Sequence, residues 1–378
     1  MRLQQTALLI ASAAALAACG AATPSPSASP TASPTSSPAP TSAPVVAAPS
    51  PTPARPSFEP LFLAFTDMDP DPGVLMLASG QTTGPIPSEP VIGGDGTLTI
   101  SGPLGGRLIG TDGHSIVALS SDGTLTTLEK NVAGSPSVVG RDDGQAWAWA
   151  VQTNSPACGS KTRAAFDVYT DDGNGARKIA SASFGAGVTQ VSLAAWTSAG
   201  IVASGDNGCG FFSASTLAVS PAILIDPATG AAIGLASRIG TDCSFQDIAD
   251  DGTIACYVGG SAPGIRVITP DGMQTKYTVP GLTSQQCING GVALSADASV
   301  AAVSITCHMK TSTQLFLLDL ASGHVVTVTG AADLAPTLWT PDDILIATEF
   351  GVHRTYSVTP AGRATLINAK YAAQTSIG

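Results

Sequence analysis

The 378-residue sequence predicts an all-β fold: a β-propeller of seven four-stranded blades that follows an N-terminal tether, with six or eight blades as the alternatives. Three observations predict this fold. A glycine-ended turn recurs along the chain, a second family of turns alternates with the first, and short apolar runs separate the two families. Repeats of roughly 40 to 50 residues that hold several short strands are typical of propeller blades.

The first family of turns ends in glycine, and its successive members lie 39 to 57 residues apart. Asp, Ser or Pro precedes the glycine in these turns. Asp and Ser can bond the backbone two residues on, Pro presets φ, and Gly accepts the positive φ that closes the turn. Apolar runs of strand length, such as Ile116–Leu119 and Ile265–Ile268, stand before the turns. The glycines are Gly80, Gly123, Gly173, Gly230, Gly272, Gly323 and Gly362.

The second family of turns is rich in Asp and lies upstream of these apolar runs. A strand-like run follows each of its members, for example Thr253–Val258 and Ile344–Thr348. Two turns per repeat predict a four-stranded meander in which the glycine turn delivers the fourth strand. Asp is expected in such turns for backbone reasons, so the acidic pairs there require no functional explanation. The turns lie at 140–144, 196–200, 249–252, 295–298 and 339–343.

The first blade lacks a strand-like run that could form its innermost strand, because its two apolar runs, 61–66 and 74–77, follow the Pro-rich segment directly. The C-terminal segment from Tyr371 to Ile377 is of strand length. We expect this segment to supply the missing strand. The ring would then close by pairing the end of the chain with the first blade.

The segments 294–303 and 315–323 resemble the WD40-like repeat of TolB-type β-propellers. The pattern is degenerate at 248–272 and 339–362 and weaker before residue 130, so the resemblance covers about half of the blades. It implies a fold and no catalytic residue. Propellers serve as binding platforms in some proteins and as enzyme scaffolds in others.

The first 20 residues resemble a bacterial lipoprotein signal. Met1 and Arg2 give a positive start, residues 7–18 are apolar, and the sequence Leu-Ala-Ala-Cys at 16–19 has the form of a lipobox. The resemblance implies cleavage after residue 18 and acylation of Cys19. The apolar stretch is too short to span a bilayer comfortably, which favours a removed signal. An ordinary secretory signal with a chance cysteine is the alternative.

Residues 19–57 read as a lipidated cysteine followed by a disordered linker. Pro, Ser, Thr and Ala make up almost all of this segment, and no charge appears between Cys19 and Arg55. Such a composition cannot bury a core. We expect the linker to hold a propeller domain, residues 58–378, off the membrane on the extracytoplasmic side, at the bacterial cell surface or in the periplasm.

Six cysteines follow Cys19, an even number that suggests disulfides in an exported protein. Two pairs flank turns of the second family, so that each would join the first two strands of one blade. The remaining two cysteines fall in long loops between the second and third strands of consecutive blades. Zinc binding is the competing interpretation, but the sequence has no Cys-x-x-Cys spacing. The predicted bonds are Cys158 with Cys209, Cys243 with Cys256, and Cys287 with Cys307.

The formal net charge of −11 argues against a nucleic-acid groove, which needs clustered Lys and Arg, and equally against direct adhesion to anionic lipid. We therefore expect the acyl chains on Cys19 to be the only contact with the membrane. We also expect a monomer, no nucleic-acid partner and no cofactor.

Two weak candidate sites stand out in the sequence. Asp67, Asp69 and Asp71 alternate as calcium ligands do, but Pro72 stands where the EF-hand pattern requires Gly, and a solvated hairpin loop is the alternative. Three tryptophans in or beside predicted strands, Trp147, Trp149 and Trp196, are candidates for stacking on a ligand. Packing between blades is the default interpretation for such rings.

The four histidines fall in different predicted blades, and no nucleophile elbow or zinc-protease motif is present. The sequence therefore favours a lipid-anchored binding or scaffold module whose loops recognise a protein, a glycan or an envelope component. The alternative is a propeller enzyme, a lyase, lactonase or glycan hydrolase, with its active site at the channel mouth. Whether the chain is an enzyme stays open at this stage.

Overall fold

The computed structural model describes residues 61–374 apart from ten short gaps, at 66–73, 86–97, 135, 159, 207–220, 241, 283–286, 308–309, 341 and 350–351. The chain divides into two compact units, Met1–Pro53 and Ala54–Gly378, and all described residues belong to the second. The described part of the chain contains no helix long and apolar enough to cross a membrane. The predicted signal, the predicted lipidation site Cys19 and the predicted linker up to residue 57 lie outside the described residues.

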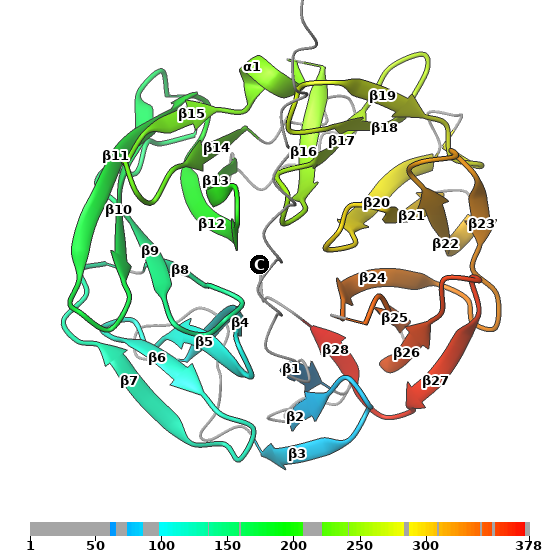
Figure 1. The fold of residues 1–378 in the computed structure, drawn as a ribbon, viewed down its shortest axis with the longest axis horizontal. Helices are drawn as coiled ribbons and strands as arrows, with labels where there is room; N and C mark the ends of the chain where they lie inside the picture. The colour runs from blue at the N-terminus through cyan, green and yellow to red at the C-terminus, as the bar shows by residue number, and fades with distance from the viewer. Residues whose placement is uncertain are drawn as a thin grey trace, which may run out of the picture. The chain divides into compact units, whose positions relative to one another are not determined.

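The second unit is a ring of seven four-stranded antiparallel sheets, which we call the first to seventh blades (Figure 1). The first blade runs, from the centre outward, through β28 (Ala372–Gln374), β1 (Leu61–Phe65), β2 (Val74–Leu77) and β3 (Thr82–Pro85). The second holds β4 (Thr99–Leu104), β5 (Arg107–Thr111), β6 (Ile116–Leu119) and β7 (Leu125–Glu129). The third holds β8 (Ser137–Gly140), β9 (Trp147–Gln152), β10 (Arg163–Asp171) and β11 (Arg177–Ala186).

The other four blades repeat this order. The fourth holds β12 (Gln190–Thr197), β13 (Gly200–Asp206), β14 (Ala222–Ile225) and β15 (Ala232–Gly234), and helix α1 (Ala236–Ile239) follows it. The fifth holds β16 (Cys243–Ile248), β17 (Ile254–Val258), β18 (Gly264–Ile268) and β19 (Gln274–Tyr277). The sixth holds β20 (Cys287–Leu294), β21 (Val300–Cys307), β22 (Lys310–Asp319) and β23 (Val325–Thr327). The seventh holds β24 (Leu334–Trp339), β25 (Leu345–Glu349), β26 (Arg354–Val358) and β27 (Ala364–Asn368).

The middle strands of each blade are buried on both faces, because neighbouring blades pack face to face. All residues of β6 and β17 are buried, whereas most of β7 and β19, on the outside of the ring, is exposed. This explains why the middle strands appear in the sequence as unbroken apolar runs. The core is divided into layers between blades. One cluster, for example, joins residues of the fifth and sixth blades.

Both predicted families of turns are present. The seven glycine turns join the third and fourth strands of the blades, and all seven glycines have positive φ. The second family joins the first and second strands. In an antiparallel meander these two connections leave from the same edge, so both families lie on one face of the ring, which we call the turn face. The loops between second and third strands lie on the opposite, loop face.

The C-terminal strand closes the ring, as the sequence predicts. β28 pairs with β1, and Ala373 stands opposite Ala64. Two buried threonines of the seventh blade hold the strand in place. Thr348 Oγ1 donates to the Ala373 carbonyl at 2.8 Å, while Thr355 Oγ1 donates to the Tyr371 carbonyl at 2.8 Å and accepts from the Ala373 amide at 2.9 Å. The first blade therefore receives its innermost strand from the far end of the chain.

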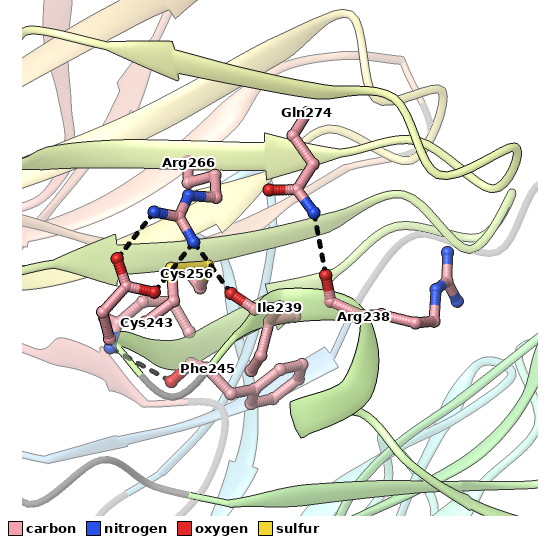
Figure 2. Close-up of a disulfide and its surroundings, with 9 residues drawn as sticks. Arg238, Ile239, Cys243, Phe245, Cys256, Arg266 and Gln274 are labelled. Atoms are coloured by element: carbon pink, nitrogen blue, oxygen red, sulfur yellow. Dashed lines mark hydrogen bonds and ion pairs between the residues drawn. A yellow bond between two sulfur atoms is a disulfide. The ribbon is translucent and has the colours of Figure 1, made fainter. Parts of the chain in front are cut away.

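The disulfide between Cys243 and Cys256 is present in the structure and fully buried in the fifth blade (Figure 2). A β-bulge between Phe245 and Asp247 places Phe245, not Cys243, opposite Cys256, so the bond runs diagonally between β16 and β17. Beside it, Arg266 forms an ion pair with Asp242 at 2.8 Å and donates to the Ile239 carbonyl at 2.9 Å. Arg266 thereby fixes the end of α1 against the fifth blade.

Candidate functional site: a groove on the turn face

A groove of about 570 Å³ lies on the turn face at the seam between the fifth and sixth blades. One wall comes from the fifth blade, through its two turns and the outer strand β19. The opposite wall comes from the two turns of the sixth blade. The lining residues are Asp251, Thr253, Val267, Thr269, Met273, Thr275 and Tyr277 from the fifth blade, and Asp297, Ala298, Ser299 and 320–323 from the sixth.

At the groove, the glycine turn of the sixth blade does not rest on the backbone of its neighbour. A Cβ built on Gly230 would lie 2.0 Å from the Ile179 carbonyl oxygen of the preceding blade, and one on Gly80 would lie 2.4 Å from the Ile367 carbonyl oxygen. At these seams the turn sits directly on the backbone of the neighbouring outer strand. A Cβ on Gly323 would meet only the Tyr277 ring, at 3.7 Å. The aromatic ring separates the two blades at this seam.

Tyr277 is held in this position by hydrogen bonding and packing. Its hydroxyl donates to the Leu320 carbonyl of the sixth blade, so the polar end of the ring is satisfied while its faces remain apolar. Burial raises the pKa of the Tyr277 hydroxyl, and the negative charge of Asp319 adds to that effect. The phenol therefore remains a neutral donor and a fixed part of the groove wall.

Met273 supplies an exposed apolar surface at the groove. Its side chain is 65% exposed, the highest fraction among the large apolar residues that the structure describes as exposed. The residue follows the glycine of the turn and contributes to the lining. A flexible, polarisable thioether left in solvent beside an aromatic wall is a common feature of binding surfaces.

The turns of both blades place carboxylates in or beside the groove. Asp251 and Asp297 line it, Asp271 lies between the lining residues Thr269 and Met273, and Asp319 directly precedes Leu320. Hydrogen bonds from the turns hold the pKa of Asp271 and Asp319 below the ordinary value, chiefly those from Thr269 and from the Ser322 amide, respectively. The pKa of Asp297 is also lowered; its partial burial opposes this, but hydrogen bonds from Ser299 and Ser295 prevail.

The tryptophans singled out in the sequence pack between blades. Trp147 and Trp149 are buried in a cluster formed by the second and third blades, and Trp149 stacks on Tyr169 with ring centroids 5.4 Å apart. Trp196 is half-buried and packs against the cluster between the third and fourth blades, with the Arg141 guanidinium 5.8 Å from its ring centroid. The three rings occupy two different seams, and none lines the groove.

The other residues predicted from the sequence divide between the described and undescribed parts. Asp67, Asp69, Asp71 and Cys209 lie outside the described residues. Cys158 is disulfide-bonded on the loop face, and the backbone register sets Cys287 directly opposite Cys307. Where side chains are described, no three His, Cys, Asp or Glu residues gather closely enough to hold a metal ion.

The groove residues Met273 and Tyr277 are not predicted from the sequence. One signal is present in the sequence: Met273 precedes the polar residues of the outer strand β19 and Tyr277 ends the strand, so two large side chains flank a polar stretch. The decisive feature, the ring of Tyr277 beside Gly323, joins residues of two different blades and leaves no local pattern.

Two acidic groups outside the groove also have displaced pKa values. Burial, together with the adjacent Asp171, raises the pKa of Glu129 to about 7. Burial raises the pKa of Asp247 to about 6, against the effect of hydrogen bonds from the Leu294 and Ile248 amides at 2.7 and 2.8 Å. Asp247 lies on an inner strand and its bond to Leu294 links the fifth blade to the sixth, which indicates a structural role.

No protein-family model and no curated protein sequence matches this chain. Among solved structures, an oligogalacturonate lyase from Vibrio parahaemolyticus is similar with a TM-score of 0.50 at 11% identity, over 84% of this chain and 89% of the lyase. A putative TolB from Agrobacterium tumefaciens gives 0.44 at 13% identity, over 77% of this chain and 98% of the other. TolB from Acinetobacter baumannii gives 0.41 at 16%, over 75% and 66%. Similarity at this level of identity concerns the fold alone, and the fold of this chain is a seven-bladed β-propeller.

Proposed function

We propose that this protein is a lipid-anchored, extracytoplasmic binding module that holds a segment of a partner protein in the groove between its fifth and sixth blades. The observation that carries the proposal is the groove itself, in which Tyr277 keeps two blades apart and Met273 lies exposed. A volume of about 570 Å³ is within the range of sites that accept small ligands or several side chains of a peptide.

The chemistry of the lining favours a protein partner. The groove combines an aromatic ring and a thioether with hydroxyls and carboxylates at its rim. Protein interfaces have this composition, with aromatic and Met side chains at the core and a polar rim around them. The lining belongs to short turns braced by hydrogen bonds, so little conformational freedom is lost on binding.

The proposed location is supported by the disulfide chemistry and by the N-terminal sequence. Disulfides persist in oxidising compartments and are rare in the cytosol, and the Cys243–Cys256 bond is fully buried. The lipobox ending at Cys19 adds an acyl anchor to this location. The Pro-rich linker would let the propeller reach a partner at some distance from the lipid.

Site-specific photocrosslinking in intact cells tests the binding proposal. A benzoylphenylalanine at Met273 should crosslink to a discrete partner protein. The matched control is the same residue at Ile233, on the outer strand of the fourth blade, where the side chain is 54% exposed. If both positions give the same adducts, or if neither gives any, the groove is not the binding site.

Substitution of Cys19 tests the anchor. The C19A variant should leave the membrane fraction for the soluble fraction, and mass spectrometry of the wild-type N-terminal peptide should show Cys19 with acyl chains attached. A variant that stays in the membrane fraction would contradict the anchoring proposal and leave the groove proposal unaffected.

A further inference from the structure

We infer that the groove between the fifth and sixth blades binds a cationic segment, one that carries Lys or Arg beside an apolar side chain. This inference rests on the proposed function and specifies the chemistry of the partner. It comes from three features of the groove: the sign of its charge, the way its turns fix that charge, and the apolar wall beside it.

All formal charges of the lining residues have one sign. Asp251 and Asp297 are in the lining, and no Lys, Arg or His is among the lining residues. Asp271 and Asp319 extend the negative charge along the two glycine turns. Beside the lining, the Arg238 guanidinium donates to the Thr269 carbonyl at 3.2 Å, and His324 interacts with Asp319, whose pKa it helps to lower, so the excess of negative charge comes from the four carboxylates. A positively charged segment is therefore the complementary partner.

The carboxylates are held in place before a ligand arrives. Asp319 Oδ1 accepts from the Ser322 amide and hydroxyl, both at 2.7 Å, and Asp297 Oδ1 accepts from the Ser299 amide at 2.9 Å and the Ser295 hydroxyl at 2.7 Å. Asp271 Oδ1 accepts from the Thr269 hydroxyl and from the Met273 amide at 3.3 Å. The same bonds hold these groups in the ionised form. The negative charge thus persists at neutral pH, at fixed positions.

The apolar wall sets a second requirement. Met273 stands two residues after Asp271, and the Tyr277 hydroxyl donates to the carbonyl of Leu320, the residue after Asp319, so the apolar surface adjoins both acidic turns. The aliphatic stem of Lys or Arg, or an adjacent apolar side chain, would cover this surface, and a cation near the ring face would gain a further attraction. A neutral glycan would satisfy the hydroxyls and leave the charge uncompensated, so we favour a protein segment.

Asparagine variants can test the role of charge while they preserve the turns, because Asn Oδ1 can accept the hydrogen bonds that Asp Oδ1 accepts here. The test variant is D271N/D319N. The matched control is D226N, in the equivalent glycine turn of the fourth blade, where Asp226 accepts from the Ala228 amide at 2.8 Å and its pKa is likewise lowered by the turn. D226N removes the same kind of charge at a different seam.

The probes are two fluorescein-labelled peptides of equal length, in which Leu and Thr alternate with either Lys or Glu. Their binding to the detergent-solubilised full-length protein is measured by fluorescence anisotropy. The Lys peptide should bind the wild type more tightly than the Glu peptide does. D271N/D319N should weaken it about three- to ten-fold, the range expected for two solvent-exposed charge contacts, while D226N changes it less than two-fold. Raising the salt concentration should weaken binding to the wild type more than binding to D271N/D319N.

The possible results separate the two proposals. If the Lys peptide binds D271N/D319N and the wild type equally well, the inferred charge recognition is wrong. If both peptides bind with equal affinity and both crosslink to benzoylphenylalanine at Met273, the groove remains a binding site and its preference for cations is wrong. If neither peptide binds and Met273 gives no crosslink in cells, the proposed function fails as well.

Discussion

Asp171 acts on the carboxyl group of Glu129 across the seam between the second and third blades and contributes to the raised pKa of Glu129. Glu129 ends the outer strand β7, and Asp171 is the buried last residue of β10, where it also accepts from the Gly173 amide at 2.6 Å. Burial and this neighbour raise the pKa of Glu129 to about 7. Glu129 therefore takes up a proton close to neutral pH at this seam.

The E129Q variant should remove a pH dependence from the stability of the fold. The pKa of Glu129 is higher in the folded state than in the unfolded chain, so the folded protein retains a proton that the unfolded chain has lost. Stability should therefore fall as pH rises from about 4.5 to about 7 and level off above that range. Since Glu129 is half-exposed, we expect E129Q to gain roughly 1–2 kcal/mol at about pH 8. Urea unfolding of both proteins at about pH 5 and pH 8 measures this, and an unchanged pH profile in E129Q would contradict it.

The T355V variant should loosen the closure of the ring. Thr355 is fully buried. Its hydroxyl donates a hydrogen bond to the Tyr371 carbonyl and accepts one from the Ala373 amide. Valine has nearly the same shape but leaves both backbone groups unsatisfied, at a cost of about 2–3 kcal/mol. Hydrogen exchange at β28 should rise along with the loss of global stability. T365V, at an exposed position in β27, serves as the control and should change neither quantity.

Alanine at two equivalent glycines should separate backbone strain from the contact between blades. Gly230 and Gly272 have φ of 70° and 89°, so alanine is strained at both positions. A Cβ meets nothing within 4 Å at Gly272 but would lie 2.0 Å from the Ile179 carbonyl oxygen at Gly230. G272A should cost about 1 kcal/mol, and G230A about 1–3 kcal/mol more. Equal losses in denaturant unfolding would show that the fourth-blade turn does not rest on its neighbour.

Removal of the Cys243–Cys256 disulfide should destabilise the protein through the unfolded state. The two residues are 13 apart in sequence, and constraint of a loop of this length is worth about 3 kcal/mol. C243A/C256A should lose approximately this amount in guanidinium unfolding without reductant. Dithiothreitol should lower the stability of the wild type more than that of the variant. Equal effects of the reductant on both proteins would contradict a stabilising role for this bond.

Peptide mapping under non-reducing conditions should find Cys287 joined to Cys307. The backbone register sets the two residues directly opposite each other at the open ends of β20 and β21, a spacing that suits a bond across neighbouring strands. The same map should join Cys158 to Cys209. A peptide that joined Cys158 to Cys287 would contradict both assignments.

The turns explain why so much of the architecture can be predicted from the sequence. The chemistry of a turn is local, so the Gly and Asp residues near 250–252 and 269–272 reveal both connections of the fifth blade. The strand expected at 371–377 could be predicted because a meander with a missing strand has only one free end left. The bulge at Phe245 could not be foreseen, since it depends on packing around the inner strand, and it sets Cys256 opposite Phe245, two residues from Cys243.

The candidate site is the part that the sequence does not reveal. The groove depends on Tyr277 and Gly323, which lie in different blades and meet only when the ring is complete. The tryptophans are candidates for ligand stacking because they are large rings in short strands. Their number and spacing, however, do not distinguish packing in the core from stacking on a ligand. Packing against Tyr169 and the second blade accounts for Trp149.

Seven sheets of one topology form a ring that would look much the same after each seventh of a turn. The ring of Tyr277 removes that equivalence, because it distinguishes the seam beside Gly323 from those beside Gly80, Gly230 and Gly362. A partner that engages this seam must approach in one rotational setting about the central axis. One aromatic side chain on an outer strand thus fixes the rotational orientation of a partner on a pseudo-symmetric propeller.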